Sequence, residues 1–302
     1  MISSRTANLK ARFSQDLVAP WLFSLPAILL LLGFIVTPFV LAVIFSFTNL
    51  RLLSPIPTRS IGLENYIRTF QDPIFVRALT NNLFFVVIVV PLQTGLALAL
   101  ALLVNRQMAG VKVFRTIYFA PVVTVLAVAA TIWRLLYDPD VGFINGFLGA
   151  VSGGALHPNW LRSTSTAFLA IIIMSVWQGV GFQMVVLLAG LQDIPHDLYE
   201  AATVDGASPW QRFRFVTVPQ LRNPLIFVVT ITTILAFRLF DQVYVMTNGG
   251  PLDSTQTLML LLVDVGYARQ RIGQGSAIAV IFFVIVLSIS LAQRLFIREE
   301  AT

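Results

Sequence analysis

Six long apolar runs constrain the fold of this chain more than any other feature of its sequence. A helix needs about 20 mostly apolar residues to cross a lipid bilayer. Only 11% of the 302 residues are charged and 57% are hydrophobic, whereas about 25% charged residues is usual for a soluble domain. We therefore predict an all-α integral membrane protein with six transmembrane helices, at roughly 21–48, 79–104, 115–137, 166–190, 223–246 and 275–297.

The distribution of basic residues predicts how these helices are oriented. An even number of spans places both termini on one side of the membrane. More of the Lys and Arg residues, including both lysines, lie on that side than in the loops on the other side. Because positive residues concentrate in cytoplasmic segments, we predict an N-in, C-in topology. Residues 1–20 then form a cytoplasmic tail, since the apolar run after them is too long for the core of a cleaved signal peptide.

The loops predicted on the outer side, at about 49–78, 138–165 and 247–274, are each too short to bury a core of their own. We therefore interpret residues 1–302 as a single transmembrane domain.

The sequence also argues against several classes of function. The net charge of +6 comes from basic residues that flank apolar runs, so we expect contacts with the lipid bilayer and no nucleic-acid binding. There is no cysteine, and the two histidines, His157 and His196, are far apart, so we predict no metal site. The sequence has no GxxxxGKS/T phosphate loop, so we predict no ATPase site, and we assign no catalytic residue in this chain.

The polar segment between the fourth and fifth spans would face the cytoplasm. Pro195 suits the first turn of a short helix. Asp205 and Gly206 are a turn signal, in which Gly206 can adopt the left-handed conformation that stops this helix. Ser208 is then a good N-cap for a second short helix that begins at Pro209. The segment is therefore predicted to be a helical hairpin.

This hairpin has two possible roles. Ala201 and Ala202 give its first helix a small face that another protein surface can approach closely, and Glu200 beside them can pair with a cation or cap a partner's backbone. Alternatively, the hairpin lies on the lipid surface, with Trp210 and Phe213 as anchors. The residues alone leave both roles open.

The fourth span carries the string SVWQGVGFQ, which mixes aromatic rings with amides. Proteins bind sugars with this combination, because the faces of a sugar ring stack on aromatic side chains and its hydroxyls hydrogen-bond to amides. Spacings of three to four residues place Ser175, Gln178, Gly179 and Phe182 on one helical face. We predict a solute pathway here, with helix packing as the alternative, over Ser175, Trp177, Gln178, Gly179 and Phe182.

Ionisable residues within the fifth span are candidates for function, because charges inside a membrane are costly. Arg238 and Asp241 lie three residues apart, which predicts that they share one face of a continuous helix. They would then form a structural ion pair, or they would hydrogen-bond a solute such as a polyol.

Several motifs, in order along nearly the whole chain, resemble one protein family. The string EAATVDGASPW, followed by Val218 and Pro219, is similar to the EAA loop of permease subunits of binding-protein-dependent ABC importers. NNLFFVVIVVPLQTGLALALALLVNR, FRTIYFAPVV and IWRLLYDPDVGFIN resemble the second and third spans of these permeases, and FDQVYVMTNGGP resembles the end of the fifth. The context LAGLQDIPHDLYEAATVDGASPWQRF resembles the carbohydrate-uptake branch, which includes maltose and glycerol-phosphate importers.

The resemblance implies a role for the hairpin at about 191–222. In this family the EAA loop is the coupling helix, which docks into a cleft on a cytoplasmic ATPase subunit. The bend of the hairpin would lie at Gly206. The implied ATPase-coupling residues are Glu200, Ala201, Ala202, Asp205, Gly206, Ala207 and Pro219.

The resemblance also implies a function and a set of partners. The chain would be a transmembrane permease subunit of an ATP-driven importer for a sugar, polyol or related solute, in a bacterial plasma (inner) membrane. It would work by alternating access. Its partners would be a second permease subunit, two ATPase subunits that bind ATP and Mg, and an extracytoplasmic solute-binding protein. This chain itself would hold no cofactor.

In the family's maltose importer, sugar is held on this face of the fourth span and on the fifth span. The fifth span of this chain is mostly apolar at those positions, which suits a smaller solute or a site held mainly by the partner permease. Arg238 is also consistent with an anionic solute such as glycerol phosphate. The fifth-span candidates for the solute pathway are Thr232, Leu235, Arg238, Leu239 and Asp241.

A gradient-driven secondary transporter of small polar solutes is the alternative function. Such a protein needs buried carboxylates for its coupling ion, and many have an inverted repeat. Asp241 is the one strong candidate carboxylate in the spans, and the sequence shows no such repeat. A membrane-embedded enzyme is a weaker alternative, because it would require clustered His, Asp or Glu residues that the sequence does not have.

Overall fold

A computed structural model describes residues 20–21, 23–105 and 110–299 of the chain. Most of the predicted cytoplasmic tail, residues 1–19, lies outside the described residues. Within the described ranges the regular structure is helical, apart from an isolated β-bridge between Thr48 and Ser60. Contacts divide the chain into two compact units, Arg68–Asp264 with Ile281–Thr302 and Met1–Ile67 with Val265–Val280.

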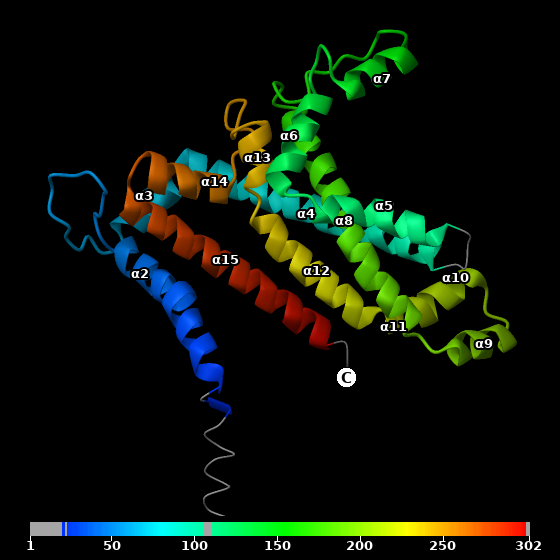
Figure 1. Ribbon diagram of the computed structural model, residues 1–302. Helices are drawn as coiled ribbons and strands as arrows, with labels where there is room; N and C mark the ends of the chain where they lie inside the picture. Colours follow the sequence, from blue (N-terminus) through cyan, green and yellow to red (C-terminus); the bar gives the residue numbers. More distant parts are fainter. Residues whose placement is uncertain (1–19, 22, 106–109, 300–302) are drawn as a thin grey trace, which may run out of the picture. The chain divides into compact units, whose positions relative to one another are not determined.

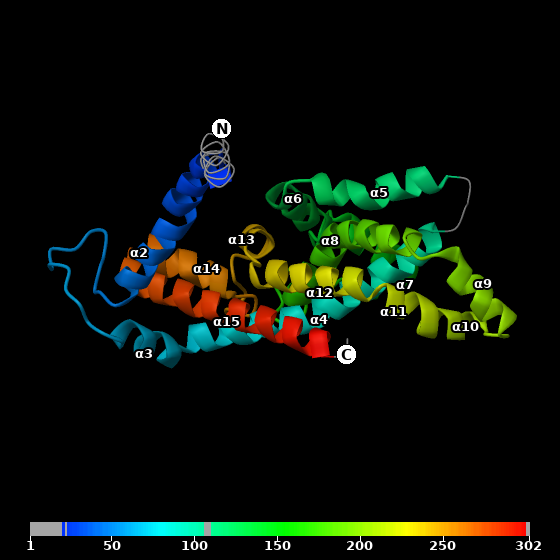
Figure 2. The same cartoon turned by 90° about the horizontal axis from the view of Figure 1, so that it is seen from below.

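The larger unit holds the helices that build the candidate functional sites. In this unit α8 packs against α4 and α5, α12 packs against α4, and α13 packs against α6 (Figures 1 and 2). The helices that lie wholly within it are α4 (Pro73–Val104), α5 (Val111–Val123), α6 (Leu126–Leu136), α7 (Phe143–Ser152), α8 (Ala167–Gln192), α9 (His196–Val204), α10 (Pro209–Arg212), the π-helix η2 (Phe213–Thr217), α11 (Val218–Gln220), α12 (Arg222–Phe237), α13 (Asp241–Met246) and α14 (Leu258–Val263).

Small and medium-sized side chains pack α4 against α8. Ala97 and Ala101 of α4 are fully buried, in one cluster with Met184 and Leu187 of α8 and Val228 of α12. In a membrane, lipid tails are as apolar as leucine, so helices associate through close packing, which small residues allow. The cluster therefore holds α4, α8 and α12 together at one end of the unit.

The third predicted span, 115–137, is not one continuous helix. α5 ends at Val123, α6 begins at Leu126, and the two helices are bent by 102°. Pro121 lies in the last turn of α5. Proline has no N–H and its ring clashes with the carbonyl of the preceding turn, so it ends or kinks many helices. By contrast, α4 continues through Pro91. The third predicted span is therefore made of two helices with a sharp bend between them.

The fifth predicted span, 223–246, is also interrupted. α12 ends at Phe237, and α13 begins only at Asp241. Arg238 is the C-cap of α12, so the prediction that Arg238 and Asp241 share one face of a continuous helix is wrong. The stretch between the two helices gives their side chains independent directions.

Side chains from two other elements hydrogen-bond to the backbone at this interruption. The fully buried Asn82 of α4 donates from Nδ2 to the carbonyl of Phe237 at 3.1 Å, and its Oδ1 accepts from the backbone N–H of Leu258 at 2.8 Å. The hydroxyl of Thr257 donates to the carbonyl of Leu239 at 2.9 Å. Non-helical backbone at membrane depth is stable only where such partners satisfy it, so these bonds explain why the interruption is tolerated.

The smaller unit contains the first apolar helix, Phe23–Ser46, which includes the π-helix η1 (Leu32–Val36) and α2 (Thr37–Ser46). Asn65 donates from Nδ2 to the carbonyls of Ser46 and Thr48, at 2.8 Å in each case. These bonds fasten the start of α3 (Glu64–Gln71) to the end of this helix. Three elements run from one unit into the other along the chain, namely α3 (Glu64–Gln71), η3 (Asp264–Ala268) and α15 (Ile272–Glu299).

The described helices confirm an all-α membrane protein. Four are long and apolar enough to cross a bilayer by length and composition, and two bent pairs raise the number to six if each pair forms one span. The pairs are Val113–Val123 with Leu126–Leu136, and Pro209–Gln220 with Arg222–Phe237. The N-in, C-in orientation stays a prediction.

Candidate functional site

The larger unit contains a cavity of about 420 Å³ between α4, α5, α6, α8, α12 and the start of α13. Most of the residues predicted for the solute pathway line it, although they come from elements far apart in the sequence. These residues are Ser175, Gln178, Gly179, Phe182, Thr232, Leu235, Arg238, Leu239 and Asp241.

The predicted face of α8 contributes to this cavity, except for one residue. Trp177 does not line it: its side chain packs against Trp133 of α6, with 5.4 Å between the ring centroids, and is 41% exposed. Two residues along a helix correspond to about 200° of rotation, so Trp177 cannot share a face with Ser175. Including Trp177 with the pathway residues was therefore wrong for this cavity.

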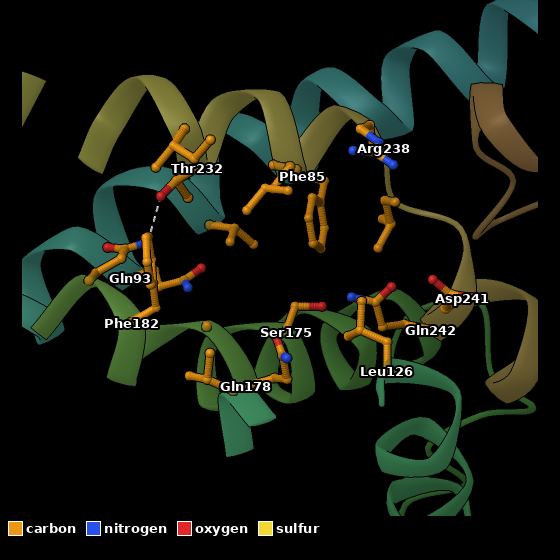
Figure 3. Close-up of a pocket in the computed structure, with 18 residues that line it drawn as sticks. Phe85, Gln93, Leu126, Ser175, Gln178, Phe182, Thr232, Arg238, Asp241 and Gln242 are labelled. Carbon is orange, nitrogen blue, oxygen red and sulfur yellow. Dashed lines mark hydrogen bonds between the residues drawn. The ribbon is translucent and has the colours of Figure 1, made fainter. Parts of the chain in front are cut away.

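The cavity has a charged end and an amide end. Figure 3 shows Arg238, Asp241 and Gln242 at one end and Gln93, Phe182 and Thr232 at the other. At the amide end, Nε2 of Gln183 donates to the hydroxyl of Thr232 at 2.7 Å. At the charged end, Arg238 and Asp241 form no ion pair in the described part of the chain.

The sequence analysis missed the contribution of α4 to the cavity. Gln93 of α4 is 6% exposed and lines the cavity opposite Gly179 of α8. A Cβ at position 179 would collide with the amide nitrogen of Gln93, so glycine is what allows this amide to lie here. The one available signal was a glutamine inside the apolar string VVPLQTG. Gln183, the last residue of SVWQGVGFQ, and Ala236 of the fifth span also line the cavity. The other missed lining residues are Phe85, Val89, Val122, Leu126, Ile231 and Gln242.

The polar segment after α8 forms a helical hairpin, as its capping signals predicted. At the end of α9 the N–H of Gly206 bonds to the carbonyl of Thr203 at 3.1 Å, and the N–H of Ala207 bonds to the carbonyl of Ala202 at 2.9 Å. This pattern is a Schellman motif, with Gly206 in the left-handed conformation at φ 76°. α10 then begins at Pro209, after a capping box between Ser208 and Gln211.

The predicted coupling residues are arranged along this hairpin. Glu200 and Ala201 of α9 and Asp205 at its C-cap are exposed, whereas Ala202 and Ala207 are half-buried. Pro219 is exposed in α11, and the helix ends at Gln220, one residue later. At the other end of the hairpin, Pro195 is the N-cap of α9 and therefore precedes the first turn.

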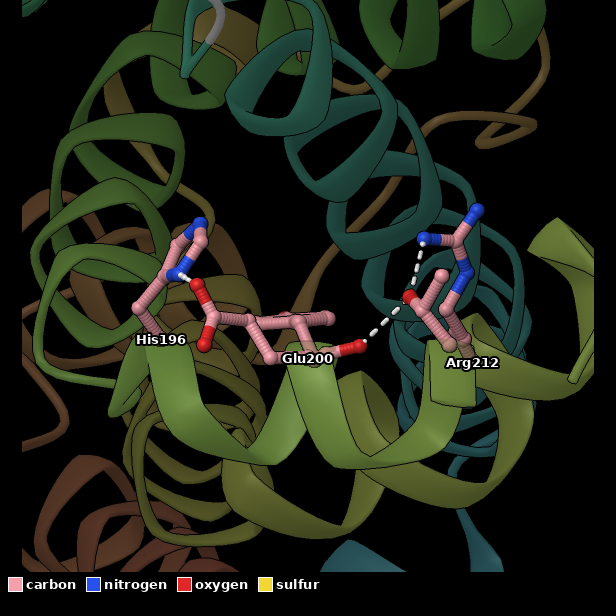
Figure 4. A network of polar contacts seen from close by, with 5 residues as sticks. His196, Glu200 and Arg212 are labelled. Atoms are coloured by element: carbon pink, nitrogen blue, oxygen red, sulfur yellow. Dashed lines mark hydrogen bonds and ion pairs between the residues drawn. The ribbon is translucent and has the colours of Figure 1, made fainter. Parts of the chain in front are cut away.

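Side-chain hydrogen bonds join the two arms of the hairpin. Arg212 donates from a guanidinium nitrogen to the hydroxyl of Thr203 at 3.1 Å, and the hydroxyls of Tyr199 and Thr217 lie 3.0 Å apart. On the other side of α9, Nδ1 of His196 lies 3.0 Å from a carboxylate oxygen of Glu200 (Figure 4). The hairpin is thus held as one unit, while the carboxylate of Glu200 stays exposed.

The string NGGP forms the turn that its composition predicts. Asn248 and Gly249 have positive φ angles of 50° and 85°. The segment that follows the turn is held by α4, because Arg77 donates to the carbonyl of Leu252 at 2.6 Å and Asn81 donates to the carbonyl of Gln256 at 2.9 Å.

Comparisons with known proteins place the chain in a family. Residues 16–299 match the family described as "Binding-protein-dependent transport system inner membrane component". The chain is 37% identical to the probable ABC transporter permease protein YurN of Bacillus subtilis, over 94% of this chain and 98% of YurN. It is 36% identical to the trehalose/maltose transport system permease protein MalF of Thermococcus litoralis, over 96% of each chain.

A solved structure has the same fold. A chain of a bacterial ABC transporter involved in the import of the acidic polysaccharide alginate superposes with a TM-score of 0.82, covering 95% of this chain and 99% of that one, at 22% identity. The family, the absence of an ATPase domain and the membrane location predicted from the sequence are confirmed. The chain belongs to the permease subunits of binding-protein-dependent ABC importers, the multi-pass inner-membrane components of these transporters.

Proposed function

We propose that this permease subunit carries a sugar, an oligosaccharide or a related polyol through the cavity of the larger unit. The observation that carries the proposal is the lining of that cavity, where the neutral amides of Gln93, Gln178 and Gln183 lie with the rings of Phe85 and Phe182. Amides hydrogen-bond to hydroxyls, and aromatic faces cover the apolar faces of sugar rings. This combination suits a neutral polyhydroxylated solute.

The names of relatives support this class of solute. Besides the trehalose/maltose permease, the chain is 32% identical to the lactose transport system permease protein LacF of Rhizobium radiobacter, over 96% of this chain. A cavity of about 420 Å³ also lies within the usual range for a small-molecule site. Because the chain belongs to the permeases of ABC importers, we no longer propose the alternative of a gradient-driven transporter.

We further propose the assembly in which the chain works. A second permease subunit would form the other half of the translocation pathway, and two cytoplasmic ATPase subunits would bind ATP and Mg. An extracytoplasmic solute-binding protein would deliver the solute on the side of the NGGP turn. The hairpin at about 191–222 would dock on an ATPase subunit through the exposed face of α9, which carries Glu200 and Ala201.

The proposed mechanism is alternating access driven by the ATPase subunits. The hairpin bonds between Arg212 and Thr203 and between Tyr199 and Thr217 make the docking helix move together with the rest of the hairpin. α11 then leads directly into α12 through Leu221. Because α12 lines the cavity, a displacement of the hairpin is passed to the wall of the solute pathway.

Co-purification followed by an activity measurement tests this function. The chain is extracted from its native membrane in mild detergent, and the co-purifying chains are identified by mass spectrometry. We expect a second permease and an ATPase subunit, and ATP hydrolysis that rises when the binding protein and a sugar such as maltose, trehalose or lactose are added. Stimulation by amino acids or inorganic ions, with none by sugars, would contradict the proposed solute class.

A further inference from the structure

Two glutamine–threonine pairs lie side by side on α12, and only one of them faces the cavity. Gln183 of α8 donates from Nε2 to Thr232 at 2.7 Å, and Gln293 of α15 donates from Nε2 to Thr233 at 2.9 Å. Because Thr232 and Thr233 are consecutive, they point to different sides of α12. The first pair lines the cavity and the second does not.

The cavity-facing pair has unused hydrogen-bonding capacity. Gln183 is 1% exposed and Thr232 is 5% exposed, yet Oε1 of Gln183 has no hydrogen-bond partner among the described residues. Oε1 of Gln293, in the pair outside the cavity, is unpaired as well, so what distinguishes Gln183 is that its spare polar atom lies at the cavity. The conclusion does not depend on which way the amide is turned: one of its two polar atoms bonds Thr232, and the other is left over. A buried polar group without a partner is costly, and in native proteins such groups call for an explanation.

Gln93 brings a second unpaired amide to the same end. It lines the cavity from α4 and has no protein hydrogen-bond partner in the described ranges. Its place beside α8 depends on Gly179, since any Cβ there would meet the amide nitrogen. Two amides from two helices, together with the hydroxyl of Thr232, therefore converge on one end of the cavity (Figure 3).

We propose that Gln93, Gln183 and Thr232 form a subsite that binds a hydroxyl group at the leading end of the transported solute. A hydroxyl both donates and accepts one hydrogen bond, as this set requires: an amide oxygen accepts, while an amide N–H or the threonine hydroxyl donates. The subsite contains no cation, so it selects a neutral alcohol over a carboxylate or phosphate. This inference rests on the proposed function, because it names the part of the solute that the same cavity recognises.

The subsite lies at the inner end of the pathway if the N-in orientation holds. α8 then runs inward, so Gln183 is deeper than Ser175 by about 12 Å along the helix axis. α12 runs outward, so Thr232 is deeper than Arg238. A solute entering from the outer side passes the charged end first and places its leading hydroxyl at the amides last.

The test uses the complete importer, with both permeases, the ATPases and the binding protein, reconstituted in liposomes. The probe is whichever of maltose, trehalose and lactose gives the wild-type complex the highest transport rate. Gln183→Leu and Gln93→Leu remove the amides at nearly constant volume. Gln293→Leu is the matched control, because it makes the same change at a glutamine–threonine pair outside the cavity.

We expect Gln183→Leu and Gln93→Leu each to lower the maximal transport rate about three- to tenfold, the effect of one lost hydrogen bond. The half-saturating sugar concentration should stay unchanged, because the binding protein sets it. Gln293→Leu should transport like the wild type, and all three complexes should assemble and show the same thermal unfolding midpoint within a few degrees. The unchanged unfolding midpoint and the wild-type rate of Gln293→Leu together would distinguish a lost solute contact from a general structural defect.

Three results would overturn the subsite. If Gln183→Leu and Gln93→Leu transport at the wild-type rate, the amides do not touch the solute, while the sugar-importer function stands. If Gln293→Leu lowers transport as much as they do, the loss is structural and the subsite is likewise wrong. If no sugar of the panel is transported by the wild type, the proposed solute class fails and the subsite fails with it.

Discussion

The coupling hairpin and the cavity are built in opposite ways. The hairpin is local: a Schellman motif at Gly206 and a capping box from Ser208 to Gln211 shape it within a few residues. The cavity is non-local, because its lining comes from six helices between Phe85 and Gln242. The difference suggests that the chain separates two tasks, with energy transfer in a short self-folding segment and solute recognition in the tertiary packing.

The two regions should therefore fail differently when they are changed. A hairpin variant should separate ATP hydrolysis from transport and leave the preference among solutes unchanged. A cavity variant should alter the rate or the preference for solutes and leave docking of the ATPases unchanged.

The largest effect is expected at the bend of the hairpin. Gly206 has φ 76°, and a Cβ there would meet no atom within 4 Å, so the penalty for Gly206→Val is one of backbone conformation, about 1–2 kcal/mol or more for a β-branched residue. We expect transport to fall at least tenfold while the chain still inserts. Gly206→Asn, which tolerates this conformation, should keep most of the transport. Equal transport in the two variants would refute the need for a left-handed residue.

The next largest effect is expected at the interruption of the fifth span. Asn82→Leu leaves the buried carbonyl of Phe237 and the N–H of Leu258 without their partner, and each such loss costs about 1–3 kcal/mol. Thermal unfolding of the purified complex should shift down by several degrees. Asn82→Asp keeps the acceptor for the N–H of Leu258, so its unfolding midpoint should lie between those of the wild type and Asn82→Leu. An unchanged midpoint in both variants would show that other groups satisfy this backbone.

A smaller effect is expected where α4 meets α8. Gly179→Ala places a methyl group where the amide of Gln93 lies. The amide is the far end of a flexible side chain and can move, so we expect a severalfold loss of transport rate with little loss of stability. Adding Gln93→Ala to Gly179→Ala removes the collision but also the amide. The double variant should therefore transport no better than Gln93→Ala alone, and full recovery would contradict a role for this amide.

The smallest effect is expected from the bond that joins the arms of the hairpin. Arg212→Leu removes the exposed bond to Thr203, and exposed hydrogen bonds of this kind contribute about 1 kcal/mol or less. We expect the number of solutes moved per ATP hydrolysed to fall about twofold. Arg214→Leu is the control, because Arg214 is exposed in the same hairpin and makes no such bond between its arms. If both variants move the same number of solutes per ATP hydrolysed, the hydrogen bond between Arg212 and Thr203 does not contribute to coupling.

The same contrast explains what the sequence could predict. The turn at Gly206, the N-cap at Ser208 and the start of α10 at Pro209 follow from neighbouring residues, so they were predicted at the right positions. Pro91 and Pro121 look alike in the sequence, yet α4 continues through the first and α5 ends just after the second. Whether a helix continues through a proline or ends near it depends on tertiary packing, which the local sequence does not show.

Residues that act through distant partners were the hardest to predict. The break after Phe237 is held by Asn82, which lies 155 residues earlier in the chain. Gln93 becomes part of the cavity only because Gly179 of another helix makes room for it. Trp177 looked like a pathway residue by composition, but its rotation about α8 turns it toward Trp133. No pattern within one helix shows which of its faces a distant helix will leave open.

Cross-linking the hairpin in the assembled importer shows whether it docks on an ATPase subunit. The chain has no cysteine, so Ala201→Cys provides a single attachment point for a bifunctional maleimide–amine cross-linker, and Val151→Cys in α7 provides a control on the predicted outer side. We predict that mass spectrometry finds Cys at position 201 linked to an ATPase subunit, more strongly when nucleotide binding closes the ATPases, and finds no such link from position 151. If the chain inserts normally but position 201 never links to an ATPase subunit, the hairpin is not the docking segment.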